Sequence, residues 1–154
     1  MQNKCPACGE ARLVADECDE RVEVAGVTFH ATVPCERCKA CGETLLSDRT
    51  LERFELTVAV ELARMGRRTG TALRYMRKAL GYGSAELAAL LGVTPETFSR
   101  WETGTRDPDA GAFALVGALA ADRLEGHEGT AAMLRGIASP RALPKRARRV
   151  HVAA

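Results

Sequence analysis

The chain has 154 residues, of which 46% are hydrophobic and 27% charged, an ordinary composition for a globular protein of one domain or two small ones. It contains no apolar stretch long enough to span a membrane, and its first residues lack the hydrophobic core of a signal peptide, so we expect a cytoplasmic protein. The net charge of +2 divides into −4 over residues 1–66 and +6 over residues 67–154, but five cations of the basic half lie after residue 138, so charge alone does not establish nucleic-acid binding.

A short phrase occurs twice near the start: Lys-Cys-Pro-Ala-Cys-Gly at residues 4–9 and Arg-Cys-Lys-Ala-Cys-Gly at residues 37–42. Two thiolates spaced by two residues can bind one metal from a tight turn, and the following glycine permits the bend. Two such turns complete a tetrahedral site, so we expect one structural Zn²⁺ held by Cys5, Cys8, Cys38 and Cys41. Redox dithiols are the alternative for the same spacing.

Between the two turns the sequence alternates with a period of two residues, which predicts a β-hairpin that turns at Ala25-Gly26. With the cysteine turns it forms a small zinc ribbon, whose one aromatic residue, Phe29, makes the metal a large part of its folding free energy. Cys18 and Cys35 are expected to be free thiols on or near the strands, although a ligand pair Cys35/Cys38 is an alternative to Cys38/Cys41. His30 alternates with the apolar positions and is expected to be exposed.

From Ser47 the pattern becomes helical and continues to Gly66, with apolar residues every three or four positions. This helix either packs on the domain that follows or serves as a connector or dimer-forming element. Residues 66–70 contain two glycines and are expected to form a linker or hinge.

Two short helices are then predicted, over residues 71–80 and from Gly83 or Ser84 to about residue 91. They precede a third over Pro95–Thr103, within the stretch Val93–Gly104. Thr94 is a good N-cap for this third helix, and Phe98 and Trp101 share one face of it. A helix, a turn containing glycine and a capped polar helix are typical of a helix-turn-helix.

A further helix is expected to start at Asp107-Pro108-Asp109, and a weaker one over residues 129–138. The predicted fold class is therefore α+β in two small domains: a zinc ribbon over residues 1–46 and an all-α domain of five helices over residues 71–138. Residues 47–70 are the expected connecting helix and hinge. Residues 139–154 carry two prolines and five cations and are expected to form a disordered basic arm.

These residues carry a resemblance that covers roughly residues 4–125. The stretches A-L-R-Y-M-R-K-A-L-G, A-E-L-A-A-L-L-G-V and F-S-R-W-E-T-G-T-R-D-P resemble an Xre/Cro-type helix-turn-helix domain. The order of zinc turns, hairpin, Cys-Gly-Glu and this domain resembles the MqsA (YgiT-type) zinc-finger antitoxin and regulator family. That resemblance implies the same four zinc ligands, a dimerising DNA-binding domain and an N-terminal domain that captures a toxin. It also implies a buried ion pair between Arg77 and Glu102.

The family's base-reading positions fall on Glu96 and Arg100. Glu96 replaces an amide-bearing residue and cannot donate to a base, whereas Arg100 can contact guanine bidentately. Ser84 stands where related domains usually carry a glutamine. These two departures from the family pattern, at Glu96 and Ser84, affect the sequence of the operator and the affinity for it rather than the fold. The candidate DNA-contacting residues are Ser84, Thr94, Glu96, Thr97, Ser99, Arg100 and Arg106.

We therefore expect a dimeric regulator that binds a palindromic operator in double-stranded DNA, acting as the antitoxin of a toxin–antitoxin pair and repressing its own operon. One alternative is a stand-alone repressor without a toxin. Another is a rubredoxin-like electron carrier, which would normally surround its iron with aromatic side chains. A hydrolytic enzyme is disfavoured because a four-cysteine zinc site has no open coordination position.

Overall fold

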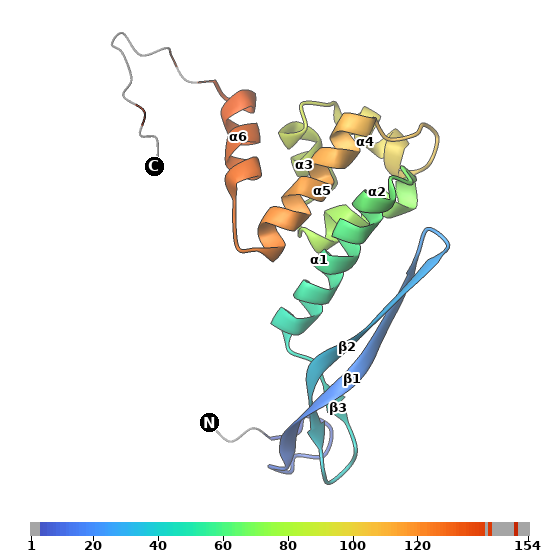
Figure 1. Cartoon of the computed structure of the whole chain (residues 1–154), viewed down its shortest axis with the longest axis vertical. Helices are drawn as coiled ribbons and strands as arrows, with labels where there is room; N and C mark the ends of the chain where they lie inside the picture. The colour runs from blue at the N-terminus through green and yellow to red at the C-terminus, as the bar shows by residue number, and fades with distance from the viewer. Residues whose placement is uncertain (1–3, 141, 143–149, 151–154) are drawn as a thin grey trace.

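The computed structural model describes residues 4–140, 142 and 150, and it has the predicted mixed α+β class. An antiparallel β-hairpin lies alongside a body of helices, and the end away from its turn projects beyond them (Figure 1). The basic arm predicted for residues 139–154 lies largely outside the described residues. The elements follow one another as β1 (Leu13–Val24), β2 (Val27–Cys38), β3 (Thr44–Leu45), α1 (Asp48–Met65), α2 (Gly70–Ala79), α3 (Ser84–Leu90), α4 (Pro95–Glu102), α5 (Ala110–Leu124) and α6 (Gly129–Ala138).

The hairpin turns at Ala25 and Gly26, as its alternating pattern predicts. Both residues have positive φ, 54° and 77°, which is the geometry of a type I′ turn whose twist matches that of the flanking strands. Each strand has 12 residues, and pairing continues from Val24 opposite Val27 to Leu13 opposite Cys38. The ladder therefore runs from the tip of the hairpin directly into the cysteine turns. The short strand β3, which the sequence analysis did not anticipate, pairs with residues 36–37 of β2.

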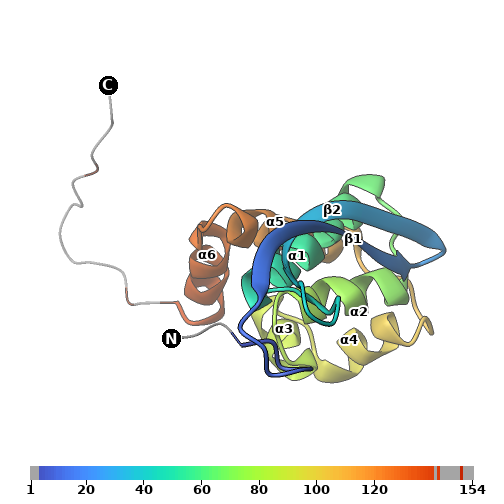
Figure 2. The ribbon, with the colours of Figure 1, turned by 90° about the horizontal axis from the view of Figure 1, so that it is seen from below.

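One face of the hairpin lies on the helices. Val24 and Val33 are buried and belong to the same apolar core as Phe54 of α1, and Figure 2 shows the hairpin crossing over α1 and α2. The other face carries the intervening residues, including His30, and is exposed to solvent. The period-two pattern thus assigns the two faces of the hairpin correctly.

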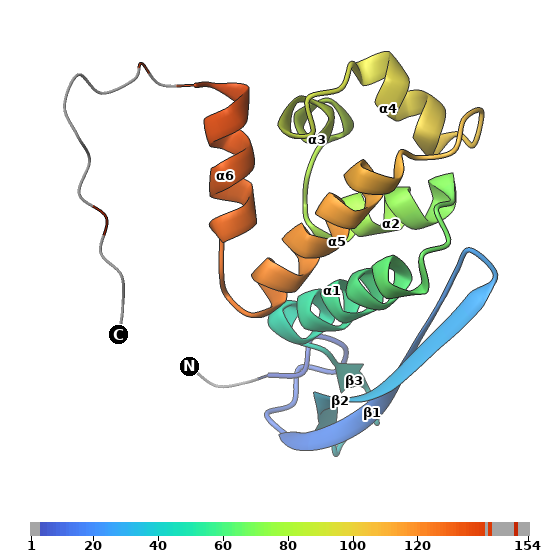
Figure 3. The ribbon, with the colours of Figure 1, turned by 45° about the horizontal axis from the view of Figure 1, so that its top comes forward.

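Helix α1 begins after the N-cap Ser47, whose hydroxyl accepts a hydrogen bond from the Thr50 N–H at 3.1 Å, and it ends at Gly66. It packs along α5 (Figure 3). At their crossing a Cβ on Gly117 would lie 2.4 Å from Cβ of Ala63, so the two backbones approach closely because both residues are small. Packing is thus the role that the structure shows for α1.

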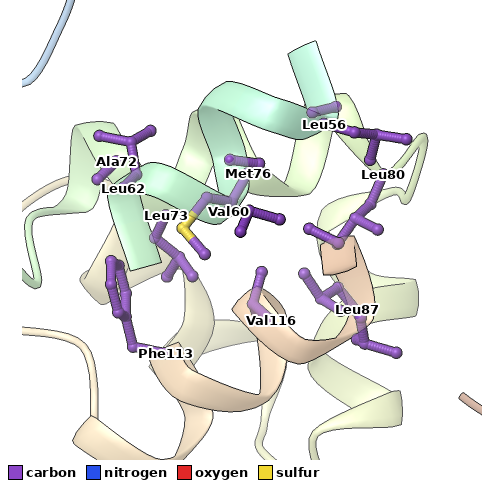
Figure 4. Packing of buried hydrophobic residues seen from close by; sticks show 14 of the residues in the cluster. Leu56, Val60, Leu62, Ala72, Leu73, Met76, Leu80, Leu87, Phe113 and Val116 are labelled. Atoms are coloured by element: carbon purple, nitrogen blue, oxygen red, sulfur yellow. The ribbon is translucent and has the colours of Figure 1, made fainter. Parts of the chain in front are cut away.

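The helical region consequently contains six helices in the described part of the chain, whereas the prediction gave five to its all-α domain and treated the preceding helix as a connector. The physical reason for the difference is that α1 shares one core with the others. Figure 4 shows its buried residues meeting those of α2, α3 and α5. The labelled residues of this core are Leu56, Val60, Leu62, Ala72, Leu73, Met76, Leu80, Leu87, Phe113 and Val116. Among the described residues, no helix combines the length and apolar character required of a membrane span.

Candidate metal centre and nucleic-acid interface

The two cysteine turns have the same backbone geometry. In the first turn the Gly9 N–H donates to the carbonyl of Cys5 at 2.8 Å, and in the second the Gly42 N–H donates to the carbonyl of Cys38 at 2.8 Å. Both glycines adopt positive φ, 77° and 79°, a conformation that other residues rarely take. The repeated phrase in the sequence therefore encodes a repeated structure, which presents two sulfur atoms from each turn.

The turns bring the four sulfurs into one group, here called the cysteine cluster: Cys5, Cys8, Cys38 and Cys41. Cys5 Sγ lies 3.7 Å from Cys41 Sγ, and Cys8 Sγ lies 3.7 Å from Cys38 Sγ. Sulfurs at the corners of a tetrahedron with metal–sulfur bonds of ~2.3 Å would be separated by about 3.8 Å. Spacing and chemistry therefore fit one tetrahedral metal ion, and the cluster that would hold it has two buried members, Cys5 and Cys38, and two exposed members, Cys8 and Cys41.

The cluster perturbs the acidity of its thiols. The Cys41 N–H has the largest effect on Cys38 by donating to its sulfur; burial opposes it, the Ala40 N–H reinforces it, and the pKa of Cys38 falls to about 7. The Glu43 N–H lowers the pKa of Cys41, but burial and hydrogen bonding with the three neighbouring cysteines together raise it to about 12. Four thiolates cannot share this space without a cation, which is the electrostatic reason for a metal here.

Cys18 and Cys35 lie on the strands, on the face that packs against the core, and are free thiols outside the cysteine cluster. Cys35 is buried, and its hydrogen bond with Cys18, together with burial, raises the pKa of Cys18 to about 11. Asp16 pairs with Arg37 near the cluster, and this ion pair lowers the pKa of Asp16. Neither extra cysteine contributes to the group of four that could hold the metal.

Helices α3 and α4 are joined by a tight turn at Gly92, which has φ 70°, and the Val93 N–H donates to the carbonyl of Ala88 at 3.0 Å. In α4, Phe98 and Trp101 are 0% and 3% exposed and meet edge to face with ring centroids 6.0 Å apart. The aromatic face therefore anchors α4 in the core, and its opposite face is left to solvent. Figure 3 shows α3 and α4 on the side of the helical body away from β3.

A polar network fixes the C-terminal end of α4 to α2. Arg77 Nε lies 2.8 Å from Glu102 Oε1, and these side chains are 14% and 8% exposed. Arg77 also donates to the carbonyl of Tyr82 at 2.9 Å, and the Ser84 hydroxyl lies 3.4 Å from Glu102 Oε2. The two side chains of the ion pair expected from the resemblance thus lie within salt-bridge distance, and the Ser84 hydroxyl joins the network through Glu102.

The close approach of α2 and α4 also depends on Gly70, the last residue of the predicted hinge. Gly70 is buried, and a Cβ there would lie 2.3 Å from the carbonyl oxygen of Trp101. The N-terminus of α2 therefore faces the last carbonyls of α4, an arrangement that the opposite ends of two helix dipoles favour. This contact could not be predicted from the sequence, where the local sign of it is a glycine directly after the N-cap Thr69.

The predicted DNA-contacting residues lie on or next to the exposed side of α4. Glu96, Ser99 and Arg100 are exposed, and Thr97 is half-buried. The Thr94 hydroxyl caps the helix by accepting from the Thr97 N–H at 3.2 Å. Arg106 follows α4 and is exposed, and its N–H donates to the carbonyl of Arg100 at 3.2 Å. The fold thus gathers six of the seven candidates around α4, while Ser84 faces Glu102.

A family model described as the antitoxin component of bacterial toxin–antitoxin system, MqsA, matches residues 3–123. The match includes both cysteine turns and the helices from α1 to α4, and it ends just before the last residue of α5. A comparison with curated proteins found no match.

Proposed function

The chain belongs to the MqsA family of antitoxin components, and we propose that it neutralises a toxin and represses its own operon by binding DNA through α4. The single observation that best supports DNA binding is the exposed polar side of α4, held in place by Phe98, Trp101 and the Arg77–Glu102 pair. A helix fixed in this way on one side presents the side chains of its other side from a fixed backbone, as a reading helix requires.

In this proposal Arg100 carries most of the sequence discrimination. It can donate two hydrogen bonds to guanine in the major groove, worth about 1–3 kcal/mol. Glu96 can accept from the amino group of cytosine, while Thr97, Ser99 and Arg106 suit contacts with phosphate or bases. Thr94 and Ser84 would contact DNA only in addition to the hydrogen bonds that they already make.

We propose that the metal is Zn²⁺ and that its role is structural. Zinc accepts four thiolates in a tetrahedral arrangement and leaves no position open for substrate, so we assign the centre no catalytic step. Iron takes the same ligands, but an iron carrier would not require the exposed helix α4. Metal analysis of the purified protein decides this point: one equivalent of zinc in a colourless protein supports the proposal, and a red protein with a reversible redox couple contradicts it.

The proposed assembly is a homodimer on a palindromic operator, with two copies of α4 about one turn of DNA apart. We also propose the division into a zinc ribbon over residues 1–46, a connecting segment over residues 47–70, a DNA-binding part over residues 71–138 and a basic arm over residues 139–154. The ribbon is the proposed toxin-binding part, since the proposal assigns DNA binding to α4 and its neighbours.

The antitoxin role and the DNA-binding role are tested separately. For the first, the polypeptide encoded by the adjacent gene is expressed alone and with this chain; growth arrest that the chain relieves supports an antitoxin, and a harmless neighbour favours the stand-alone repressor. For the second, Arg100→Ala should weaken binding to the promoter of its own gene by roughly 5- to 150-fold. Arg64→Ala, which removes an exposed cation from α1, should have little effect. Equal affinities of the wild type and Arg100→Ala would contradict the assignment of α4.

A further inference from the structure

Strand β1 is an unprotected edge of the sheet. The strand order is β1-β2-β3, so among the strands of the described residues β1 pairs only with β2 along its 12 residues. On the far side of β2, β3 covers part of the edge, and Pro34 has no N–H to offer to another strand. The outer edge of β1 contains no proline and, among the described residues, has no covering strand.

The register shows which backbone groups face outward. Val24 and Val27 flank a two-residue type I′ turn and therefore exchange hydrogen bonds, and such pairs alternate with non-bonded pairs along the ladder. The N–H and C=O groups of Asp19, Arg21 and Glu23 consequently point away from β2. Within the described part of the chain, these three exposed residues make no backbone hydrogen bond to a third element.

The next outward N–H along β1, that of Glu17, already has a hydrogen-bond acceptor within the strand. The Glu17 N–H also faces outward, but it donates to Asp16 Oδ1 at 2.9 Å. Pro34 lies opposite Glu17, at a position where its missing N–H would face away from β1, which agrees with the same alternation. The free part of the edge is therefore Asp19–Glu23.

The charge of β1 selects what can pair with this edge. The strand contains five acidic residues and one arginine, a net charge of −4. Asp16 is paired with Arg37, but Glu17, Glu20 and Glu23 have no cationic partner within salt-bridge distance among the described residues. Acidic side chains along an edge repel a second copy of the same edge, so they oppose its pairing with that copy, and they also repel the phosphates of nucleic acid. They favour a strand that carries lysine or arginine.

We infer that Asp19–Glu23 of β1 docks an extended strand of a basic partner polypeptide, which adds to the sheet through backbone hydrogen bonds. The inference rests on the proposed antitoxin function, in which that partner is the toxin. Backbone pairing supplies affinity in such a complex. The carboxylates of Glu17, Asp19 and Glu23 share the exposed face with one cation, Arg21, and by outnumbering it they supply specificity for basic side chains.

The chain offers a matched pair of variants. Asp19 and Thr32 lie opposite each other on the exposed face, and the Thr32 hydroxyl donates to Asp19 Oδ1 at 2.8 Å. Asp19→Pro removes an outward N–H from the edge of β1, whereas Thr32→Pro removes one from the opposite edge of the hairpin. Both variants lose the same side-chain hydrogen bond, and neither loses a donor in the β1–β2 ladder.

The probe is a fluorescent ten-residue peptide of alternating lysine and valine, titrated into the full-length metal-loaded protein at low salt. We expect the wild type to bind it, Thr32→Pro to bind within about twofold of the wild type, and Asp19→Pro to bind at least about tenfold more weakly. The triple variant Glu17→Lys/Asp19→Lys/Glu23→Lys should instead prefer a peptide of alternating glutamate and valine. Retention of one metal equivalent and an unchanged circular dichroism spectrum establish that each variant is folded.

Equal binding by the wild type and Asp19→Pro, or no preference of the wild type for the lysine peptide over the glutamate peptide, overturns the inference. The toxin provides an independent arm: in its complex, the amides of Asp19, Arg21 and Glu23 should exchange with D₂O at least about tenfold more slowly, while that of Thr32 stays unchanged. A toxin that is neutralised without this protection refutes the docking edge and leaves the antitoxin function intact. Peptide binding with the expected pattern but no neutralised toxin supports the edge and refutes the antitoxin function.

Discussion

Breaking the buried Arg77–Glu102 pair should destabilise the protein. Glu102→Ala removes a carboxylate that is 8% exposed and leaves a guanidinium, 14% exposed, without its counter-charge. Removing one partner of a buried pair costs about 3–5 kcal/mol. Arg77 keeps its hydrogen bond to the Tyr82 carbonyl, so we expect a loss near the lower limit, about 3 kcal/mol, or roughly a 150-fold change in the folding equilibrium constant.

Urea unfolding measures this loss, and Trp101, the only tryptophan of the chain, reports it by fluorescence from the same helix. The matched control is Glu61→Ala, which breaks the exposed pair with Arg64 and should cost about 0.5 kcal/mol or less. The double variant Arg77→Met/Glu102→Leu removes both charges and should recover at least about 1 kcal/mol relative to Glu102→Ala. If Glu102→Ala lies within about 1 kcal/mol of the wild type, or the double variant is no more stable than Glu102→Ala, the loss does not come from an unpaired buried charge on Arg77.

Three further changes test the packing of α1 on α5, the metal ligands and the buried hydroxyl of Tyr75. Gly117→Val should destabilise the protein by at least about 2 kcal/mol in urea because Ala63 occupies the space of the new side chain, whereas Gly136→Ala, at an open position in α6, should be neutral or stabilising; equal effects would contradict the close approach of α1 and α5. Cys8→Ser should abolish binding of one metal equivalent and unfold the ribbon, while Cys18→Ser should retain the metal; the reverse result would contradict the ligand assignment. Burial, with a smaller effect of Glu55, raises the pKa of Tyr75 from 10.0 to about 12, so the unfolded chain ionises first and stability should fall between pH 10 and pH 12. Tyr75→Phe should reduce that decline because it removes the ionisable hydroxyl, which is buried and has no hydrogen-bond partner among the described residues. An unchanged pH profile would contradict this origin.

Much of the fold follows from local signals in the sequence. The repeated Cys-x-x-Cys-Gly phrase identifies the two turns because positive φ after the second cysteine requires glycine. Ser47, Thr94 and Gly66 mark helix ends because a hydroxyl or a left-handed residue satisfies the backbone groups that a helix end leaves free. Period-two alternation identifies the buried face of the hairpin, since successive strand residues point to opposite sides.

The features that the sequence analysis missed depend on contacts between distant segments. A stripe of apolar residues predicts that α1 packs on something, but its partner α5 becomes visible only where Gly117 meets Ala63. Gly70 looks like a hinge residue in sequence, and only the position of Trp101 in space shows why a side chain is excluded there. The short strand β3 has too few residues for a periodic signal, and it forms because β2 supplies a partner.

The candidate site also combines features that the sequence predicts with features that only the fold reveals. The cysteine cluster could be identified from spacing alone, since each turn is a local structure and tetrahedral coordination needs two of them. The engagement of Ser84 with Glu102 could not, because it depends on the side-chain positions of two helices. The acidic edge of β1 is visible as composition in the sequence, but only the register assigns its outward hydrogen-bonding groups.

We propose that this antitoxin-family protein reads DNA with α4, a claim that hydroxyl-radical footprinting upstream of its own gene tests. We predict two protected patches with centres about one helical turn apart, both lost in Arg100→Ala and both retained in Arg64→Ala. Protection that is unchanged in Arg100→Ala, or no protection by the metal-loaded wild type, would contradict the claim.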